Sequence, residues 1–276
     1  MIKYEIGIVE ARNVIKSILD TYRYDFRDYA LTSFKRRLEQ LIMNNGFKDA
    51  EGLISRLTSS KEYFEQFLQE ITPETTEMFR DPSLWRTVRD EILHDIMKST
   101  NKPKLWVASF DSGEELYSLA IMLKESGLLS EVQIYASVIS DKILEKIKNG
   151  RIDAKELEVN DANYVRFNGK RSFTDYYRLD NGQVILDNSL IQGVNFIKLN
   201  TVYDNVPGGI KLSLFRNQTI YYNQLLMDKV LAQLANSVVP GGYLVLGVKE
   251  TLENTSSNSK YSIFNDSEKI YKKKTT

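Results

Sequence analysis

Residues 104–127, KLWVASFDSGEELYSLAIMLKESG, decide the fold class of this chain. The apolar run KLWVAS has the length of one buried strand, and after a short polar loop GEELYSLAIMLKESG shows helical periodicity. The same order, a strand and then a helix, recurs at once in VQIYASV (132–138) and SDKILEKIKNG (140–150). Strands that alternate with helices in this way predict a parallel sheet of the α/β class.

The sheet is expected to continue through the second half of the chain. VNFIKL, IKLSLF and YLVLGV predict further buried strands, and NQLLMDKVLAQLANSVV (223–239) predicts a helix before a Pro240-Gly241-Gly242 turn. At the end, KYSIFNDSEKIYKKK (260–274) predicts two short strands around a turn, and we expect its lysines to form a solvated end rather than a binding patch.

Two stretches fall outside this alternation. Residues from about 162 to 190 alternate apolar and polar side chains around Asn181-Gly182, a hairpin signal, and predict a small antiparallel β insert. Residues 6–71 carry apolar side chains at three- and four-residue spacing, which predicts a small helical domain. We therefore expect a helical domain over 1–72, a linker and connecting helix over 73–103, and the α/β domain over 104–276.

Composition excludes several classes of function. With 37 Lys and Arg against 37 Asp and Glu, the net charge gives no reason to expect a nucleic-acid partner. No apolar run approaches the roughly 20 residues that cross a bilayer, and the chain does not start with a signal sequence, so we expect no membrane insertion and a cytoplasmic location. The absence of cysteine excludes disulfides and zinc-thiolate sites, and a single histidine, His94, argues against a Ser-His-Asp triad.

The loop after KLWVAS is the first place to look for a ligand, because α/β sheets bind ligands beyond the carboxyl ends of their strands. There Gly113 permits close backbone approach, and Glu114 or Glu115 offers a carboxylate to a ligand ammonium group. The alternative is that these acids only complement the helix dipole.

Three stretches carry a resemblance to a known family. SFDSGEELYSLA (109–120) resembles the nucleotide loop of the chemotaxis-receptor, or CheR-type, S-adenosylmethionine-dependent protein-glutamate O-methyltransferases, which runs into Gly-Glu-Glu-Pro-Tyr-Ser. Upstream, TTEMFRD (75–81) resembles that family's Thr-x-Phe-Phe-Arg-Asp/Glu motif. Downstream, FRNQTIYY (215–222) resembles its Cys-Arg-Asn-Val-x-Ile-Tyr-Phe motif. The stretches occur in the family's order, and the resemblance covers nearly the whole chain.

The resemblance implies a fold, a reaction and a partner. The fold is a small N-terminal helical domain followed by a Rossmann-like class I methyltransferase sheet with a small antiparallel β insert. The reaction is methyl transfer from S-adenosylmethionine to glutamate side chains of a chemoreceptor-like protein, with S-adenosylhomocysteine as product. The partner is the set of cytoplasmic helices of a receptor or other protein substrate, docked on the β insert.

The resemblance also implies roles for particular residues. Arg80 and Tyr221 match catalytic positions, with Arg80 steering the acceptor carboxylate and Tyr221 close to the transferred methyl group. The positions that match the cofactor cleft are Thr76, Arg80, Glu114, Asn200, Thr201, Arg216 and Asn217. Each has a simpler reading: Arg80 as an ion-pair partner of Asp81 or Glu77, Tyr221 as a core aromatic, Asn200 as a turn residue.

The chain departs from the family where the ribose should bind. Family members read Ala-x-Asp-Ile-Asp at the end of the second strand, and this chain reads ASVISD (136–141), so Val138 takes the place of the ribose-binding acid. Asp141, like Asp81 before Pro82, is expected to cap a helix.

Further departures in the same cleft, Phe110 and Lys211, support a second hypothesis, a non-catalytic or weakly cofactor-binding CheR-like module that acts in binding or regulation. A methyltransferase for a different acceptor is a third.

Overall fold

The computed structural model describes residues 4–71, 77–108, 113–199, 204 and 206–275. Internal contacts divide the chain into two units, one formed by residues 1–73 with 219–229 and the other by residues 74–218 with 230–276. Within the described ranges, no helix has the length and apolar character that crossing a membrane requires.

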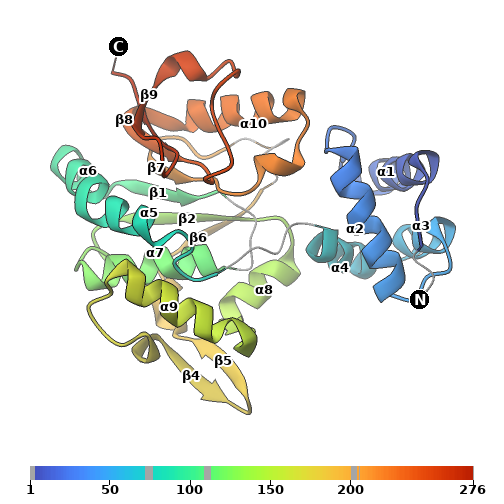
Figure 1. Ribbon diagram of the computed structural model, residues 1–276, viewed down its shortest axis with the longest axis horizontal. Helices are drawn as coiled ribbons and strands as arrows, with labels where there is room; N and C mark the ends of the chain where they lie inside the picture. The colour runs from blue at the N-terminus through green and yellow to red at the C-terminus, as the bar shows by residue number, and fades with distance from the viewer. Residues whose placement is uncertain (1–3, 72–76, 109–112, 200–203, 205, 276) are drawn as a thin grey trace. The chain divides into compact units, whose positions relative to one another are not determined.

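The first unit is built from helices (Figure 1). These are α1 (Ile8–Tyr22), α2 (Leu31–Asn44), α3 (Ala50–Ser59) and α4 (Lys61–Ile71). Their apolar stripes meet in a core that contains Phe26, Leu38 and Phe67, all at most 1% exposed, as the three- and four-residue spacing predicts. Asp49 caps α3 by accepting the Gly52 N–H at 2.9 Å, and Gly46, with φ +69°, follows the end of α2.

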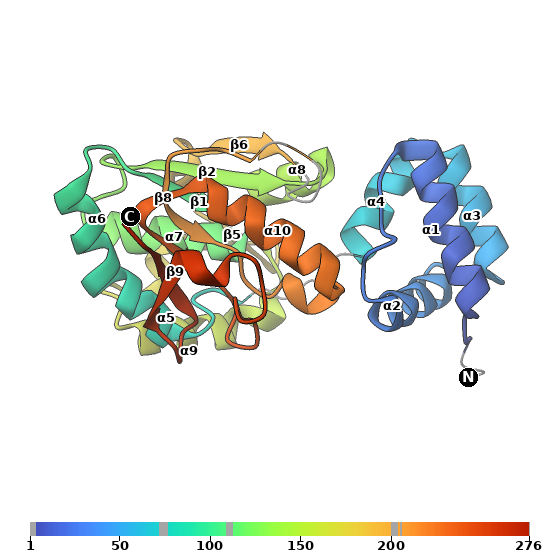
Figure 2. The same ribbon diagram turned by 90° about the horizontal axis from the view of Figure 1, so that it is seen from above.

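The second unit contains a seven-stranded sheet in the order β6-β2-β1-β7-β8-β10-β9. Its strands are β1 (Lys104–Val107), β2 (Gln133–Val138), β6 (Asn195–Lys198), β7 (Ile210–Leu214), β8 (Val238–Val245), β9 (Tyr261–Asn265) and β10 (Ile270–Lys273). The first five pair in parallel, and β10 pairs antiparallel with both β8 and β9, which confirms the expected α/β class. Figure 2 shows β6, β2 and β1 side by side.

Helices cover both faces of this sheet, and Figure 1 shows α7 (Glu114–Glu125) and α10 (Gln224–Ser237) on opposite sides of it. The remaining helices are α5 (Pro82–Thr87), α6 (Leu93–Ser99), α8 (Asp141–Asn149) and α9 (Leu157–Phe167), with a π-helical turn at Val88–Ile92 between α5 and α6. Every residue of α7 from Glu114 to Leu123 is buried, so this helix is enclosed on all sides. His94 on α6 is exposed, as expected of an ordinary polar residue.

The small antiparallel sheet has the strand order β3-β5-β4, with β3 at Arg151–Ile152, β4 at Tyr177–Asp180 and β5 at Gln183–Leu186. Asn181 and Gly182 join β4 to β5 with φ of +48° and +78°, the paired left-handed geometry of a tight hairpin. The expected insert began with strand-like residues near 162, but these lie in helix α9, and the third strand comes from residues 151–152 instead.

Two details at the end of the chain differ from expectation. Pro240, Gly241 and Gly242 lie inside β8, where the register against β7 shifts, rather than in a turn before it. The tail lysines are only partly solvated, because Lys273 Nζ donates to the carbonyls of Ala235 and Val238, both at 2.6 Å. These carbonyls end α10, and a cation there satisfies groups that the helix leaves without partners.

The carboxylate of Glu125, at the end of α7, anchors the region around the β insert to the sheet domain. It accepts the Tyr164 hydroxyl of α9, the Tyr176 hydroxyl at 2.8 Å and the Lys170 N–H at 3.1 Å. Both tyrosines are 2% exposed, and burial together with the nearby carboxylate raises the pKa of each hydroxyl, so both remain donors.

We predict that Glu125→Ala lowers the free energy of unfolding by about 3 kcal/mol, because two buried hydroxyls lose their acceptor. Urea unfolding followed by circular dichroism measures this. Glu131→Ala is the matched control, since Glu131 is exposed and its carboxylate accepts, from the described residues, only the exposed Ser130 hydroxyl. Equal midpoints for the two variants would contradict the anchoring role.

Candidate functional site

The candidate site lies at the carboxyl ends of β1, β2, β7 and β8, where the strand order reverses around β1. Hydrogen bonds continue one residue past two of these strands, β1 and β7: Ala108 N–H donates to the Leu214 carbonyl at 2.8 Å, and Phe215 N–H donates to the Val245 carbonyl at 2.9 Å. The loops that follow therefore start side by side, which is the arrangement that binds ligands in α/β sheets.

The first turn of α7 brings two acids into this region. Gly113 begins the turn with φ +109°, and a Cβ on it would lie 3.0 Å from Ile147 Cγ1, so only glycine fits there without strain. Glu114 and Glu115 follow, each 7% exposed, and the helix N-terminus stabilises their negative charge. A buried carboxylate beside a glycine turn can accept hydrogen bonds from a cationic group of a ligand.

Arg216, one residue beyond Phe215, connects three segments. Its side chain is 3% exposed, Nη1 donates to Glu115 Oε1 at 2.9 Å, and Nη2 donates to the Asp81 carboxylate. Nη2 also reaches the Arg80 carbonyl at 3.4 Å. A buried guanidinium is stable only when it is paired and hydrogen-bonded, so Arg216 ties the α7 turn and the segment around Arg80 to β7.

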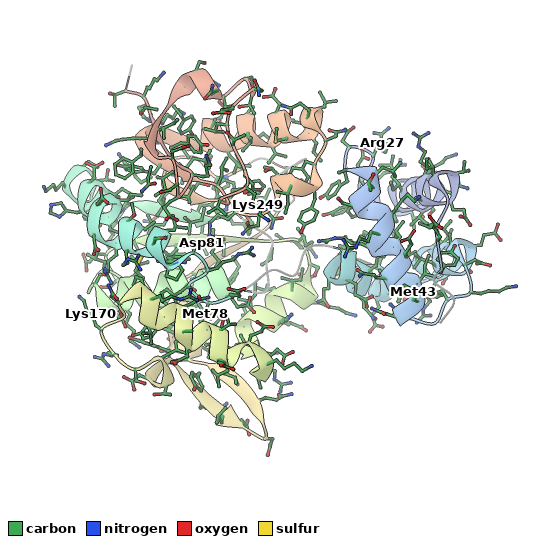
Figure 3. The ribbon with its side chains drawn as sticks, in the orientation of Figure 1. Arg27, Met43, Met78, Asp81, Lys170 and Lys249 are labelled. Atoms are coloured by element: carbon green, nitrogen blue, oxygen red, sulfur yellow. The ribbon has the colours of Figure 1, made fainter. Side chains whose placement is uncertain are left out.

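The segment Met78–Asp81 is an unusual turn (Figure 3). Phe79 and Asp81 have φ of +52° and +57°, a left-handed conformation that is rare for such residues. Asp81 precedes Pro82 at the start of α5 as predicted, but its side chain makes no cap hydrogen bond, because it pairs with Arg216. Arg80 lies between them and is half-buried.

Neither acid near Arg80 pairs with its guanidinium. Asp81 pairs with Arg216, and Glu77 Oε2 accepts the Asn163 amide at 3.1 Å. Among the described residues, no ion pair or hydrogen bond involves the Arg80 side chain. The simpler reading of Arg80 as an ion-pair partner of Asp81 or Glu77 is therefore wrong.

Glu250 holds the loop that carries Asn217. Its Oε2 accepts the Asn217 N–H at 2.8 Å and the Gly247 N–H at 2.6 Å, and the residue is 3% exposed. Asn217 adopts φ +57°. One carboxylate thus joins the loops after β7 and β8.

Val138 lies at the end of β2, 1% exposed, and its carbonyl accepts the Leu199 N–H at 3.0 Å. Its isopropyl group offers no hydrogen-bond acceptor at the end of β2. The expectation that Asp141 caps α8 is wrong: Ser140 Oγ accepts the Ile143 N–H at 3.2 Å, and Asp141 pairs with Lys198 at 2.7 Å.

Tyr221 belongs to the helical unit. Its backbone carbonyl accepts the Ala30 N–H at 2.8 Å, and the Arg37 guanidinium lies 4.3 Å from the centre of its ring. Burial lowers the pKa of Arg37, although Tyr221 and Tyr29 oppose this shift. The sequence alone does not indicate this contact, because an arginine within LTSFKRRLEQ gives no sign of the ring that it covers.

The structure thus brings some candidate residues together. Arg80 and Arg216 meet through the Arg80 carbonyl, Arg216 reaches the α7 turn of Glu114 through Glu115, and Asn217 is fixed beside them by Glu250. Thr76, Asn200 and Thr201 lie outside the described residues, as does Phe110. No cluster of three potential metal ligands occurs among the side chains that the structure describes.

An α/β sheet whose central switch point is lined by acids and arginines defines a protein that binds a nucleotide-like cofactor. The family comparisons identify it further. The model for the CheR methyltransferase SAM-binding domain matches residues 74–269, and that for the CheR methyltransferase all-alpha domain matches residues 10–72. The chain belongs to the CheR methyltransferase family and carries its S-adenosylmethionine-binding domain.

Individual relatives agree with this assignment. The chain is 33% identical to a putative methyltransferase Cher3 of Pseudomonas putida, over 96% of this chain and 97% of that protein. It is 31% identical to a chemotaxis protein methyltransferase of Vibrio parahaemolyticus over 66% of each chain. Among solved structures, the N-methyltransferase NodS of Bradyrhizobium japonicum with S-adenosylhomocysteine overlaps with a TM-score of 0.33 and 10% identity, over 61% of this chain and 63% of that one.

We predict that Arg216→Met lowers the free energy of unfolding by about 3 to 5 kcal/mol, because it leaves the buried Glu115 without its cation. Arg178→Met is the matched control: Arg178 pairs with Asp180 at 3.4 Å, but its side chain is 68% exposed. That change should cost about 0 to 1 kcal/mol. Chemical denaturation of both variants measures the difference, and a loss at Arg216 no larger than at Arg178 would contradict the role of this residue.

Proposed function

We propose that this chain transfers the methyl group of S-adenosylmethionine to glutamate side chains of a chemoreceptor-like protein. The observation that carries the proposal is the state of Arg80. Its backbone is fixed by the turn and by Arg216, both adjacent acids have other partners, and no described residue pairs with its guanidinium. A positioned cation of this kind is suited to bind a carboxylate through two parallel hydrogen bonds.

The residue inventory is sufficient for the reaction. The bound cofactor supplies a methyl group on a sulfonium, and a glutamate carboxylate is already ionised at neutral pH, so the acceptor needs no general base. A chain with one histidine, which is exposed on α6, can therefore catalyse it. Arg80 would hold the acceptor oxygen in line with the methyl carbon, and such orientation contributes about 7 to 11 kcal/mol in favourable cases.

The cofactor-binding residues divide into direct and indirect contributors. We assign the methionine ammonium group to Glu114, and the adenine end to Asn200 with Thr201 beside it. Thr76 and Asn217 would line the cleft. Arg216 would contribute indirectly, by holding the neighbouring segments in place, since its donors already bind Glu115 and Asp81.

The acceptor would be the cytoplasmic helices of a receptor, which places the protein in the cytoplasm. The β insert would serve as a docking site, because β4 is at the edge of the small sheet and Leu179 on it is 67% exposed. Tyr221 would contribute shape and one hydrogen bond near the transferred methyl group.

A second function, that of a non-catalytic or weakly binding module, is favoured by one observation. Val138 is buried and apolar where the family has the ribose-binding acid. Each lost charge-assisted hydrogen bond weakens binding by about 1.5 to 3 kcal/mol, that is, by a factor of ten or more.

We predict micromolar binding of S-adenosylmethionine and S-adenosylhomocysteine in a calorimetric titration of the full chain. With a receptor cytoplasmic fragment, the chain should produce methyl esters that alkali hydrolyses to methanol.

Arg80→Lys should reduce kcat by about tenfold or more, since an ammonium cannot reproduce the bidentate geometry. Arg12→Lys, an exposed change on α1, should have no effect.

No binding up to millimolar cofactor, together with no ester formation, would refute the methyltransferase proposal and favour the non-catalytic module. Binding without transfer would favour a regulatory module that senses the cofactor.

We also predict that Val138→Asp tightens cofactor binding by about tenfold or more, because the new carboxylate can accept both ribose hydroxyls. Burial of that carboxylate should lower the melting temperature of the free protein, and S-adenosylhomocysteine should raise it by more than in the natural chain. Val165→Asp is the control, since Val165 is 64% exposed on α9. Unchanged affinity would show that β2 does not face the ribose.

A further inference from the structure

Helix α9 buries two asparagines on one face. Asn160 is 0% exposed and Asn163 is 2% exposed, and the three-residue spacing places them on adjacent turns of the same side. The intervening Asp161 and Ala162 are exposed. Burying a side-chain amide destabilises the folded protein unless the amide forms hydrogen bonds, so the partners of these two asparagines indicate their role.

Both asparagines bind the backbone of Met78, the first residue of the Arg80 turn. Asn160 Oδ1 accepts the Met78 N–H at 2.8 Å, and Asn163 Nδ2 donates to the Met78 carbonyl at 3.1 Å. Asn163 Nδ2 also donates to Glu77 Oε2 at 3.1 Å. Two side chains of one helix therefore satisfy both the N–H and the carbonyl of Met78, which in a sheet would form hydrogen bonds with a neighbouring strand.

The orientation of the Asn163 amide is defined by its other neighbour. Arg166 Nη2 donates to Asn163 Oδ1 at 2.6 Å, and a guanidinium can only donate. The oxygen must face Arg166, so the nitrogen faces Met78 and Glu77. Asn160 differs, because its Nδ2 has no hydrogen-bond partner in the described part of the chain, and only its oxygen is used.

The next residue of the turn is held from α7. Phe79 N–H donates to Ser118 Oγ at 2.8 Å, and Ser118 Oγ donates to the Glu114 carbonyl at 2.6 Å. The Phe79 ring stacks on Phe167 of α9 with 4.6 Å between ring centres. Both α7 and α9 thus fix the backbone immediately before Arg80.

The contacts to Met78 and Phe79 can hold the backbone of this turn in a strained conformation. Phe79 and Asp81, on either side of Arg80, both have left-handed φ values, and a bulky residue stays in that region only when its surroundings over-determine it. Without the contacts to Met78 and Phe79, the turn would relax to ordinary φ values and Arg80 would leave its position.

We infer that Asn160 and Asn163 are positioning residues that hold Arg80 for catalysis by fixing the strained Met78–Asp81 turn. The inference rests on the proposed role of Arg80. The alternative is that the two asparagines only attach α9 to the sheet domain, and the two readings predict different results.

One experiment uses the same substitution at both sites. Asn160→Asp keeps the oxygen that accepts the Met78 N–H and loses no hydrogen bond seen in the described residues. Asn163→Asp loses the donor to the Met78 carbonyl and to Glu77. Both substitutions bury a carboxylate and share that cost, so we expect Asn163→Asp to lower kcat/KM by about tenfold more than Asn160→Asp does.

Amide hydrogen exchange gives a readout that does not depend on activity. In Asn160→Leu and Asn163→Asp, exchange at Met78 and Phe79 should accelerate by about tenfold or more, while amides of β1 and β7 stay protected. Asp161→Leu is the matched control, because Asp161 is exposed on the same helix, and it should change neither exchange nor kcat/KM.

A double-mutant cycle separates positioning from simple attachment. If Asn160 acts through Arg80, Asn160→Leu should lower kcat/KM by about tenfold in the natural chain and by less than about twofold in the Arg80→Ala background. Equal losses in both backgrounds would overturn the inference, and so would equal effects of Asp at positions 160 and 163. A natural chain that neither binds the cofactor nor transfers methyl groups would refute the proposed function and, with it, the task assigned to Arg80.

Discussion

The buried guanidinium of Arg216 is the interaction on which the rest of the site depends. Its side chain is 3% exposed, and a cation so enclosed must be neutralised on all sides. It satisfies this condition with Glu115 of α7, with Asp81 and with the Arg80 carbonyl. Three segments that are far apart in the sequence thus become one polar unit, because Arg216 binds the other two.

Several charged side chains of the site are bound to other groups of the protein, so their role is structural. Two adjacent acids begin α7, and the second, Glu115, is held by Arg216. The two arginines differ in their partners, since Arg216 is surrounded by its partners whereas no described residue pairs with the Arg80 side chain. Glu250 is a further structural charge, because its carboxylate accepts two backbone N–H groups and so fixes the loop of Asn217.

The polar side of the site contrasts with the end of β2. There Val138 is buried and apolar, and the nearest acid in the sequence, Asp141, is paired with Lys198. The described residues at the end of β2 therefore offer an apolar surface, whereas the turn of α7 carries paired charges. The chain belongs to the CheR methyltransferase family with this apolar strand end in place.

The sequence by itself determined the fold class, the helical domain and the Asn181-Gly182 hairpin, because periodicity and turn chemistry act between residues close in the chain. It also located the segments of Arg80, Glu114 and Arg216. Only the tertiary structure decided their partners: Asp81 pairs with Arg216, 135 residues away, instead of capping α5, and Asn160 binds Met78 across 82 residues. A side chain's best partner depends on which segments meet in space, and burial then makes that partner obligatory.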